Sequence, residues 1–536
     1  MGAGINGAGL ARYASRAGFS VLVVEQDDVA SGTTSASTRL IHGGLRYLEH
    51  GELGLVRESL REREALLTIA PHLVEPLRLY LPIYRGARRP RWQIRLGMAI
   101  YDLLSWGKSL PRHRMLSRDA LLERLPGLAA EGLIGGACYF DAQVAFPERL
   151  VVENLLDAAA HGAAVMTHTK ATRIVVEAGR VTGVEWREAR GATGRVSARC
   201  VINAAGPWLD RVAASVTGAP PPVALVDGTK GSHLVVAPFP GAPTSAAVYA
   251  EAASDGRPFF VVPWNGLYLI GTTDLRYAGD PGEAAIDDAE LAYLVSETER
   301  LFPCCGGIAE RVLYTQAGVR ALPRTPNAAP GAITRRHVIQ AHREARGVYS
   351  IVGGKLTTYR SLAAQVLARL ARDGFAPAST IAVGRERGDE RLPGAIAGRE
   401  RDALQAELIG AFGAPCAHRL VWTYGRIAER LLSDAAARPE LALPAAPGSA
   451  LLRVELVHAL ESEWAVSLID LLQRRVMLGL GADFGLDAAR AAARALVELG
   501  VWDAARAADE LAAYRRHAEA HRAAAVLSAA TRADAI

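Results

Sequence analysis

The spacing of apolar residues changes along the chain from one stretch to the next. Near the start, a helical pattern over residues 11–18 precedes an apolar strand at residues 21–24, and a longer helix follows through residues 55–71. From about residue 225 to 345, short runs of alternating apolar positions separated by turn residues predict a β-rich region. From about residue 385, Ala, Leu, Arg and Glu recur at helical spacing with few Gly or Pro, which predicts a helical domain.

The first residues carry a glycine motif that is typical of dinucleotide binding. Gly2, Gly4 and Gly7 have the spacing GxGxxG, and they precede the predicted helix and a strand that ends on Glu25. In a βαβ unit these glycines form a tight turn, let a pyrophosphate approach the backbone and let helix and strand pack closely. The first amides of the helix face the phosphates. A carboxylate at Glu25 suits the ribose hydroxyls of FAD or NAD.

The strand that normally precedes such a motif is missing, because Gly2 directly follows Met1. That strand is normally a buried run near the centre of the sheet, and without it both neighbours lose hydrogen-bond partners. We therefore expect that the native start lies upstream of Met1. The alternative is a sheet without this inner strand, with weaker stability and weaker cofactor binding.

Length and composition exclude some classes of function. A chain of 536 residues has room for two or three domains. Its net charge of +5 suits an anionic substrate or an anionic membrane surface, but it is too diffuse to indicate nucleic-acid binding. The five cysteines form no CxxC pair and no metal-ligand spacing, so we expect reduced thiols in the cytoplasm and no metal site. No run of eighteen apolar residues predicts a membrane span.

Two polar segments favour a flavin over a nicotinamide cofactor. Residues 31–51 combine hydroxyls, a glycine pair and the step Arg46-Tyr47, and such a segment suits a crevice for pyrophosphate and flavin. Residues 353–358 place free amides at a predicted helix start, where they would stabilise negative charge on the pyrimidine edge of a reduced flavin. Ordinary helix capping is the alternative interpretation of the second segment.

Collinear motifs give the chain a resemblance to the FAD-dependent glycerol-3-phosphate dehydrogenase family. The matching segments run from residue 2 to about 360: GAGINGAG, TTSASTRLIHGGLRYLEHGE, REREALLTIAPHL, AAGPWLD, KGSHLVV, VVPW, IGTTD, GVRALP and VGGKLTTYR. The resemblance implies a D-amino-acid-oxidase-like fold, FAD bound without a covalent bond, and oxidation of sn-glycerol 3-phosphate to dihydroxyacetone phosphate. The hydride would pass from substrate C2 to flavin N5. Electrons usually continue to membrane quinone in this family, and a branch of it uses oxygen.

With this resemblance the predicted fold class is α/β, in three domains. A Rossmann-type FAD-binding domain consists of residues 1–80, 145–225 and 345–380. A β-rich substrate or cap domain consists of residues 81–144 and 226–344, and residues 385–536 form the C-terminal α-helical domain.

The predicted cofactor-binding residues come from the glycine motif, the 31–51 segment, the AAGPW turn and the GGKLTT turn. They are Gly2, Gly4, Ile5, Asn6, Gly7, Glu25, Thr33, Thr34, Ser35, Ser37, Gly43, Gly44, Ala204, Gly206, Gly353, Gly354, Lys355, Leu356 and Thr357.

Substrate-binding residues follow from the charge of a phosphomonoester. Arg46 in GGLRY and Arg320 in GVRALP occupy the phosphate-binding motifs of the family, and guanidinium groups suit a phosphate of nearly two negative charges. Tyr47 and Thr272 are predicted to line the pocket, and Asp274 to hold a neighbouring basic group in position.

Two residues compete for the role of the base that takes the proton of the C2 hydroxyl. His233 in KGSH is the first candidate, because a neutral imidazole titrates near the working pH. Lys355 in GGKLTT is the rival, either orienting the hydroxyl or stabilising the product oxygen. With Arg320 they complete the predicted catalytic set. His42 is interpreted as a pocket or loop residue, because the family does not attach its FAD covalently.

A basic segment suggests contact with a membrane. Residues 85–95 contain five arginines and Trp92, and the apolar residues 96–104 follow, including Tyr101. Such a combination suits shallow insertion at a lipid interface, although a solvated loop before a core helix gives the same pattern. The resemblance implies quinone as partner, a peripheral location on the inner face of the cytoplasmic membrane, and a homodimer; no nucleic-acid partner is expected.

Alternative functions remain open at this point. A related flavin oxidase acting on an amine or amino acid would need an arginine for a carboxylate and no phosphate site. A glycerol-3-phosphate oxidase would pass its electrons to oxygen. An inactive homologue that lacks the first strand would retain part of the fold without FAD.

Overall fold

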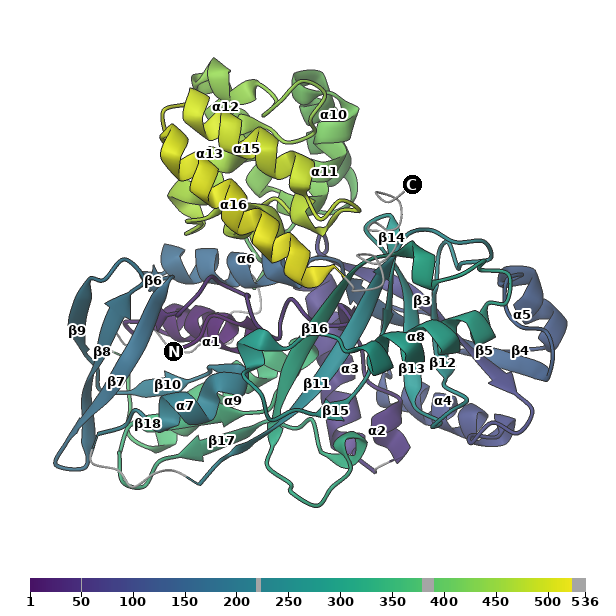
Figure 1. Cartoon of the computed structure of the whole chain (residues 1–536). Helices are drawn as coiled ribbons and strands as arrows, with labels where there is room; N and C mark the ends of the chain where they lie inside the picture. Colours follow the sequence, from purple (N-terminus) through teal and green to yellow (C-terminus); the bar gives the residue numbers. More distant parts are fainter. Residues whose placement is uncertain (50, 218–222, 378–389, 523–536) are drawn as a thin grey trace.

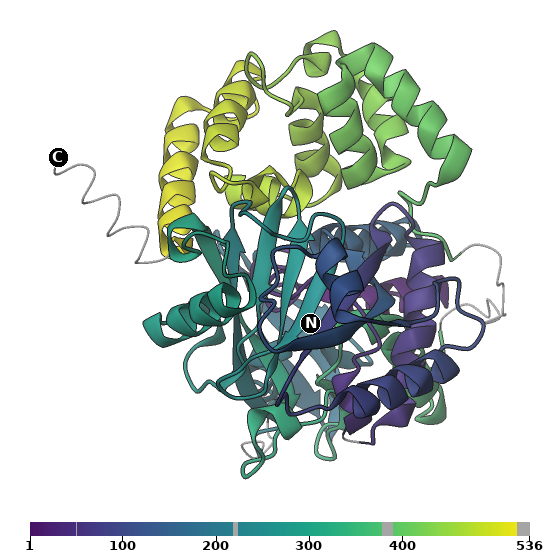
Figure 2. The same ribbon diagram turned by 90° about the vertical axis from the view of Figure 1, so that its right-hand side faces the viewer.

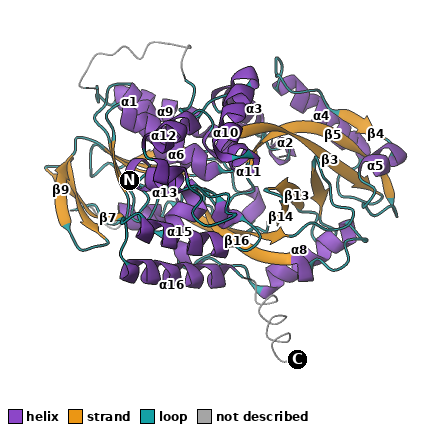
Figure 3. Cartoon of the chain, turned by 90° about the horizontal axis from the view of Figure 1, so that it is seen from above, coloured by secondary structure: helices purple, strands orange, loops and turns teal. Residues whose placement is uncertain are grey.

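The computed structural model describes residues 1–49, 51–217, 223–377 and 390–522. Strands and helices together form the body of the molecule, and the C-terminal helices form a layer above it (Figures 1 and 2). Seen from above, these helices cover the middle of the molecule, with the β7–β9 sheet at one end and the β3–β5 strands at the other (Figure 3). This α/β architecture with a C-terminal helical domain agrees with the predicted fold class.

The dinucleotide-type part is built around two small sheets with helices beside them. Its elements are α1 (Ile5–Arg16), β1 (Leu22–Val24), α6 (Pro147–Ala160), β6 (Ala164–Met166), β10 (Val201–Asn203), η1 (Gly206–Trp208), α7 (Leu209–Ala213), β17 (Val338–Ala341), β18 (Val348–Val352), η5 (Leu356–Thr358) and α9 (Tyr359–Arg372). Strand β1 pairs in parallel with β6, and β10 pairs in parallel with β18. Helix α6 begins at Pro147, because Pro is favoured at the first position of a helix.

Residues 1–3 lie between β1 and β10. The amide of Gly2 donates to the carbonyl of Val24 (2.9 Å), and the amide of Ala204 donates to the carbonyl of Met1 (2.9 Å). These hydrogen bonds connect the two small sheets at the point where the glycine motif begins. The expected upstream start stays a prediction.

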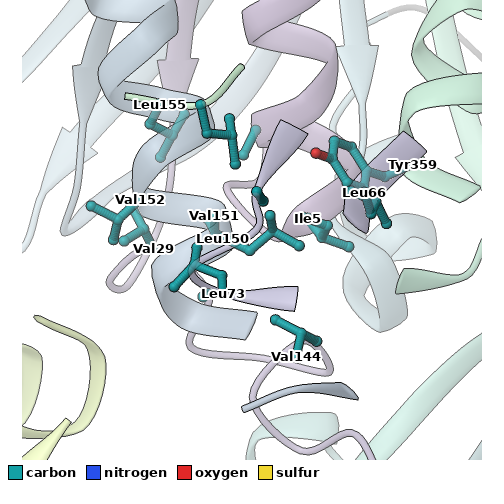
Figure 4. Packing of buried hydrophobic residues seen from close by; sticks show 14 of the residues in the cluster. Ile5, Val29, Leu66, Leu73, Val144, Leu150, Val151, Val152, Leu155 and Tyr359 are labelled. Atoms are coloured by element: carbon teal, nitrogen blue, oxygen red, sulfur yellow. The ribbon is translucent and has the colours of Figure 1, made fainter. Parts of the chain in front are cut away.

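Small residues let α1 pack tightly against its neighbours. A Cβ at Gly9 would lie 2.3 Å from a ring carbon of Tyr359, so glycine is required where α1 crosses α9. Apolar side chains of α1, α6 and α9 fill the space around them, including Ile5, Leu150 and Tyr359 (Figure 4). This packing fixes the N-terminus of α1 relative to the sheet.

A ten-stranded sheet forms the second part of the body. Its strands are β2 (Leu40–Ile41), β3 (Val74–Tyr84), β4 (Arg114–Leu116), β5 (Leu133–Val144), β11 (Val226–Val236), β12 (Ala247–Glu251), β13 (Pro258–Trp264), β14 (Leu267–Gly271), β15 (Leu275–Arg276) and β16 (Val312–Pro323). The helices and turns beside it are α2 (Arg46–Glu49), α3 (Leu53–Ile69), α4 (Arg91–Leu104), α5 (Arg118–Arg124), η2 (Pro281–Glu283), α8 (Asp288–Leu301), η3 (Ala309–Arg311) and η4 (Pro330–Ala332).

A separate three-stranded sheet contains β7 (Thr169–Glu177), β8 (Arg180–Glu188) and β9 (Thr193–Ser197). The predicted domain boundary at residue 80 falls inside β3, and β2 brings part of the predicted FAD-binding segment into the ten-stranded sheet. The predicted boundaries at 380 and 385, and the end of the chain from 523, lie outside the described residues. The domain limits therefore stay predictions.

The C-terminal helical domain packs onto the body through apolar contacts and buried ion pairs. It consists of α10 (Gly398–Phe412), α11 (Ala414–Tyr424), α12 (Ile427–Ala437), η6 (Pro439–Ala442), α13 (Arg453–Ser462), α14 (Leu468–Asp470), a π-helical turn η7 (Leu471–Arg475), η8 (Leu478–Leu480), α15 (Leu486–Glu498) and α16 (Ala504–His521). Asp28 accepts hydrogen bonds from Arg475 (2.7 and 2.9 Å) and Arg474, and Arg149 pairs with Glu463 (2.8 Å).

Asp28, His168 and Asp470 lie close enough together to suggest a cation site. However, the carboxylates of Asp28 and Asp470 already bind the guanidinium groups of Arg474 and Arg475, and His168 Nε2 donates to Asp470 Oδ2 (2.9 Å). The arginines supply the positive charge that a metal would otherwise bring. This cluster therefore serves the interface between the two domains.

Candidate functional site

A cavity of about 960 Å³ lies where the dinucleotide-type sheet meets the ten-stranded sheet. It brings together motifs that are far apart in the sequence. The predicted residues that line it are Gly2, Gly4, Ile5, Asn6, Glu25, Thr33, Thr34, Ser37, Gly44, Arg46, Tyr47, Ala204, Gly206, His233, Thr272, Asp274, Arg320, Gly353, Gly354, Lys355, Leu356 and Thr357. Its size and mixed lining are those of a cofactor and small-molecule site.

Three predicted cofactor residues do not line this cavity. A Cβ at Gly7 would lie 2.0 Å from the carbonyl oxygen of Gly2, so Gly7 serves the packing of helix on turn. The hydroxyl of Ser35 donates to the carbonyl of Ala30 (2.7 Å). Gly43 is buried behind the wall, where its amide donates to the hydroxyl of Tyr101 (2.9 Å). These three residues support the cavity wall from behind and do not form its inner surface.

The N-terminus of α1 forms one end of the cavity. Gly2 has φ +92°, and a Cβ there would lie 2.7 Å from the carbonyl oxygen of Ala204, so only glycine fits this turn. The Gly4 N-cap position offers no side-chain cap to α1, while Thr34 Oγ1 accepts from the Ile5 amide (3.1 Å). Such a helix start attracts anionic groups.

Glu25 stands beside this helix start. Its carboxylate accepts hydrogen bonds from the amides of Ala3 (2.6 Å) and Asp27 (3.1 Å). Burial raises the pKa of Glu25 above its usual range in spite of these donors. The carboxylate is therefore held in place beside the glycine motif, where an acidic residue suits ribose hydroxyls.

The turn at Gly353-Gly354 approaches the same helix from the other side. Gly353 and Gly354 have φ +77° and +111°, and a Cβ at Gly354 would lie 2.6 Å from Asn6 Nδ2. Asn6 Nδ2 donates to the carbonyl of Gly353 (3.3 Å). The turn thus places free backbone next to α1, with Lys355 and Leu356 following it into the cavity wall.

The residues present fit FAD. Asn6 Oδ1 is buried and has no hydrogen-bond partner among the described residues, and the same holds for Arg335 Nη1. The uncapped start of α1 suits a pyrophosphate, Glu25 suits ribose hydroxyls, and the Gly353 turn suits a flavin ring. A ligand with hydrogen-bond donors and anionic acceptors would supply the missing partners of Asn6 Oδ1 and Arg335 Nη1.

An arginine cluster forms the opposite part of the cavity, on the ten-stranded sheet and the segment after it. Four arginines line it: Arg46, Arg257, Arg320 and Arg335. Asp274 is the carboxylate at their centre, bound by Arg320 (3.1 Å) and Arg335 (3.2 Å), while its carbonyl accepts from Arg257 (3.1 Å). Three guanidinium groups around one carboxylate, with Arg46 in the same cavity wall, leave an excess of positive charge.

The pKa values in this cluster follow from its charges. Burial opposes ionisation of Asp274, but Arg320, Arg335 and Arg257 together lower its pKa. Burial, and then the repulsion from Arg335, lower the pKa of Arg320 to about 10. The cluster is thus under electrostatic strain that an anion would relieve.

Thr272 and Arg46 complete this part of the wall. Thr272 Oγ1 accepts from Arg320 Nη2 (2.9 Å), which fixes the guanidinium plane. Arg46 lies against Gly331, where a Cβ would lie 1.9 Å from its Nη2.

The sequence does not predict Arg257 and Arg335 as site residues, because neither belongs to a recognisable motif. Only the pairing around Asp274 identifies them.

Lys355 lies where the two parts of the cavity meet. Its Nζ donates to the hydroxyl of Ser59 (2.9 Å), a fully buried residue of α3, and stands 4.5 Å from the centre of the Tyr47 ring. Burial lowers the pKa of Lys355 to about 7. Near neutral pH the amine is therefore present in both its neutral and its charged form.

His233 is the other candidate base. Its Nε2 is 2.9 Å from Thr38 Oγ1, and its Nδ1 is buried without a partner in the part of the chain that the structure describes. Burial, with the charges of Arg320 and Arg39, lowers the pKa of His233 to about 3. Its imidazole is neutral at working pH, which makes it a weak proton acceptor. His42, which also lines the cavity, has its pKa lowered to about 3 by burial.

A buried polar network supports the wall from behind. Tyr101 on α4 accepts from the Gly43 amide and donates to Asp141 (2.8 Å), and Arg63 binds the same carboxylate (2.6 Å). All three side chains are almost fully buried. The network fixes the backbone of the Gly43-Gly44 step, and it connects α4 to the cavity wall.

Comparison with known proteins agrees with this geometry. Residues 1–360 match the family described as FAD dependent oxidoreductase, and residues 388–507 match the C-terminal domain of alpha-glycerophosphate oxidase. The chain is 38% identical to a glycerol-3-phosphate dehydrogenase of Synechocystis sp., over 97% of this chain and 95% of that protein.

Two further proteins bear on cofactor and substrate. A D-erythritol 1-phosphate dehydrogenase of Brucella abortus is 40% identical, over 69% of this chain and 72% of that protein. The crystal structure of the glycerol-3-phosphate dehydrogenase from Bacillus halodurans complexed with FAD superposes with a TM-score of 0.76 at 26% identity, covering 97% of this chain and 94% of the other.

Proposed function

The chain belongs to the FAD-dependent glycerol-3-phosphate dehydrogenase family, and on this premise we propose that it oxidises sn-glycerol 3-phosphate to dihydroxyacetone phosphate. It is an FAD-dependent oxidoreductase, as the family model and the FAD-bound structural neighbour agree. The observation that carries the choice of substrate is the arginine cluster around Asp274.

A phosphomonoester matches this cluster in charge and shape. Its phosphate carries nearly two negative charges, and planar guanidinium groups bind such oxygens in pairs. Arg46, Arg320 and Arg335 are the proposed phosphate ligands, with Asp274 holding the last two in position. An amino acid carries a single carboxylate and a positive ammonium, which four arginines would repel.

Lys355 is the proposed base for the hydroxyl at C2. A base works best when its pKa lies near the operating pH, and the pKa of Lys355 is about 7. His233, with a pKa of about 3, is proposed as a neutral hydrogen-bonding group beside the same hydroxyl. When bound, FAD supplies the hydride acceptor, at N5. Ser59 and the Tyr47 ring hold the amine in place.

A substrate panel tests this proposal. With ferricyanide as acceptor, we expect a kcat/KM for sn-glycerol 3-phosphate at least 10³-fold above that for glycerol, since the phosphate ligands are left unpaired without it. D-Erythritol 1-phosphate, glycine and D-alanine complete the panel. A higher kcat/KM for either amino acid contradicts the proposal, and a higher value for erythritol 1-phosphate moves the assignment to a longer polyol phosphate.

Quinone is the proposed electron acceptor, and an anionic membrane surface the proposed location, on the inner face of the cytoplasmic membrane. The support comes from α4, which lies on the side away from the C-terminal helices (Figure 1). Trp92, Leu96, Ala99 and Leu103 are spaced by three, four or seven residues, so they form one stripe along α4. We call them the α4 stripe. All four are exposed, Trp92 to 69% and Leu103 to 65%.

The opposite face of α4 is buried. Met98 and Tyr101 point into the core, so the helix is held in place by the fold and not by its stripe. Trp106 continues the apolar surface and is 79% exposed. Exposed arginines stand before, within and after the helix: Arg85, Arg88, Arg91, Arg95 and Arg112. An exposed apolar stripe flanked by exposed arginines suits an anionic lipid surface.

No helix of the described segments is both long enough and apolar enough to cross a bilayer. Contact through the α4 stripe would therefore be peripheral.

Vesicle binding tests this location. We expect the FAD-loaded enzyme to co-sediment with vesicles that contain phosphatidylglycerol, and the double variant Trp92→Ser/Leu103→Ser to bind at least ten-fold more weakly, since each side chain loses the free energy of apolar burial. The matched control is Leu443→Ser/Val501→Ser, which removes two exposed apolar residues of the C-terminal domain. Equal binding of both double variants would exclude α4 as the docking element.

A further inference from the structure

The C-terminal helical domain meets the body beside the cofactor cavity, at the end where Glu25 stands. Residues 25–28 and residues 167–169 form part of this end, and we call these two segments the Glu25 edge. Glu25 and His168 line the cavity there. The two segments are bonded to each other, since the His168 amide donates to the carbonyl of Asp27 (2.6 Å). A group that holds one segment therefore also holds the other.

Two consecutive arginines of the helical domain hold the carboxylate of Asp28. Arg475 donates to it through Nη2 (2.7 Å) and Nη1 (2.9 Å), and Arg474 Nε donates to the same carboxylate. Consecutive residues of a regular helix point about 100° apart, but these two belong to the π-helical turn η7. Such turns are rare and are frequently found at functional sites. Asp28 is fully buried and stands outside the cavity lining, so the arginines act on the cavity only through the Glu25 edge.

His168 carries a second contact from the helical domain to the cavity itself. Its Nε2 donates to Asp470 Oδ2 (2.9 Å), while its side chain lines the cavity and is 29% exposed. Asp470 is fixed in turn, because the same oxygen accepts from the amides of Val466 and Ser467 (2.9 Å each). The hydrogen bond to Asp470 raises the pKa of His168 above its usual range, which favours the charged imidazole.

The adenosine part of FAD is the part that this edge would meet. A carboxylate at Glu25 suits ribose hydroxyls, and the uncapped start of α1 suits the pyrophosphate. Strands β7 and β8 also contribute to the cavity lining, with Lys170, Ala171, Thr172, Arg187 and Glu188. The adenosine end of the site is therefore lined by the Glu25 edge and by the β7–β8 strands.

We propose that the helical domain is part of the FAD site: Asp470, Arg474 and Arg475 position the Glu25 edge for adenosine, so that docking of this domain and binding of FAD strengthen each other. Such a coupling is reciprocal, because two events that share a free energy of interaction affect each other by the same factor. An interface that only joined two domains would not respond to FAD. The proposal concerns the cofactor and holds for any substrate.

Amide hydrogen exchange of the apoenzyme and of the FAD-loaded enzyme tests the coupling. We expect FAD to slow exchange about ten-fold or more in residues 464–475, which carry the contacts to the Glu25 edge. Helix α12 is the internal control, because it lies in the upper part of the helical domain, away from the body (Figure 1). Its exchange should not change. Equal slowing in both segments, or none in residues 464–475, overturns the proposal.

Substitution of Arg474 tests the same coupling from the side of the helical domain. Arg474→Met removes one donor each from Asp28 and Asp470, but Arg475 still binds the first and His168 the second, so both buried carboxylates keep a partner. We expect the Kd of the apoenzyme for FAD, measured by titration of flavin fluorescence, to rise about five-fold or more. The variant touches no residue of the cavity lining by substitution, so its effect must pass through the Glu25 edge.

His168→Asn tests the contact that reaches the cavity. The backbone of His168 has a φ of 50°, which Asn tolerates, but an Asn side chain is too short to reach Asp470. We expect the Kd for FAD to rise about ten-fold or more. His168→Gln supplies a donor at nearly the length of histidine and should recover most of the affinity.

Tyr314→Phe is the matched control for both variants. It removes one buried hydrogen bond between the same two domains, from Tyr314 to the carbonyl of Leu480 (2.9 Å), on the side of the ten-stranded sheet. It should bind FAD like the wild type. An unchanged Kd in Arg474→Met overturns the proposal, as does an equal rise in Arg474→Met and Tyr314→Phe.

The failure of this proposal and the failure of the proposed function are separate, because neither exchange nor FAD titration uses a substrate. If sn-glycerol 3-phosphate supports no ferricyanide reduction by the wild type, the proposed function is wrong whatever the exchange shows. If that rate is present and residues 464–475 do not respond to FAD, only the coupling is wrong.

Discussion

Replacing Lys355 with Met is expected to lower kcat about 10²- to 10⁴-fold, the contribution typical of a general base, while the enzyme keeps its FAD. Met has nearly the length of Lys and needs no hydration, so it fits a position whose pKa is lowered by burial. The variant removes the amine that stands between Ser59 and the Tyr47 ring, 2.9 Å from the Ser59 hydroxyl. The loss should appear in kcat more than in KM, because the phosphate ligands are unchanged.

The pH dependence carries the sharper test of the same claim. Only the neutral amine can take a proton, and the pKa of Lys355 is about 7, so kcat/KM of the wild type should rise as the pH increases through about 7. In Lys355→Met this rise should be absent. The comparison variant is His233→Gln, which keeps a neutral hydrogen-bonding group. Since His233 has a pKa of about 3, this variant should keep the rise. The opposite pattern, with the rise lost in His233→Gln and kept in Lys355→Met, would make His233 the base.

Replacing Arg320 with Leu is expected to lower kcat/KM for sn-glycerol 3-phosphate about 10²- to 10³-fold. Truncating one partner of a buried, hydrogen-bonded charge pair costs about 2–5 kcal/mol, and a factor of ten corresponds to about 1.4 kcal/mol. Arg320 binds both Asp274 and Thr272, and its repulsion from Arg335 shows that the cluster lacks negative charge. Arg320→Lys should restore only part of the loss, because a point charge cannot bind two oxygens in one plane.

The readout is the ratio of kcat/KM for sn-glycerol 3-phosphate to that for glycerol. This ratio should fall sharply in Arg320→Leu, because the variant loses phosphate binding but keeps the base. Arg173→Gln is the control, because Arg173 is an exposed residue of β7 and belongs to no part of the cluster. An unchanged ratio in Arg320→Leu would show that the phosphate binds elsewhere.

Much of the cavity could be predicted from the sequence, because the glycine motifs have physical requirements that appear in their spacing. Gly2 must adopt a positive φ against Ala204, and the Gly353 turn must approach Asn6, so the motifs that contain them mark the cofactor side of the cavity. Gly7 of the first motif and Gly43 of the 31–51 segment support the wall from behind. The sequence shows that a glycine is needed there, but not on which side of the backbone the ligand lies.

The substrate side was harder to predict, because its residues are defined by contacts across the fold. Arg335 lies in no motif, and its place follows only from its bond to Asp274, 61 residues earlier. Tertiary contacts also decide which of the two candidate bases has a pKa near neutral pH. The pKa values of His233 and Lys355 follow from burial and from the charges around them, and a sequence contains neither quantity.

The decisive measurement is the absorption spectrum of the purified enzyme under anaerobic conditions, before and after addition of sn-glycerol 3-phosphate. We expect a flavin band in the visible range that is bleached by stoichiometric substrate and that glycerol at the same concentration leaves unchanged. A yellow protein whose band stays oxidised with sn-glycerol 3-phosphate would contradict the proposed function.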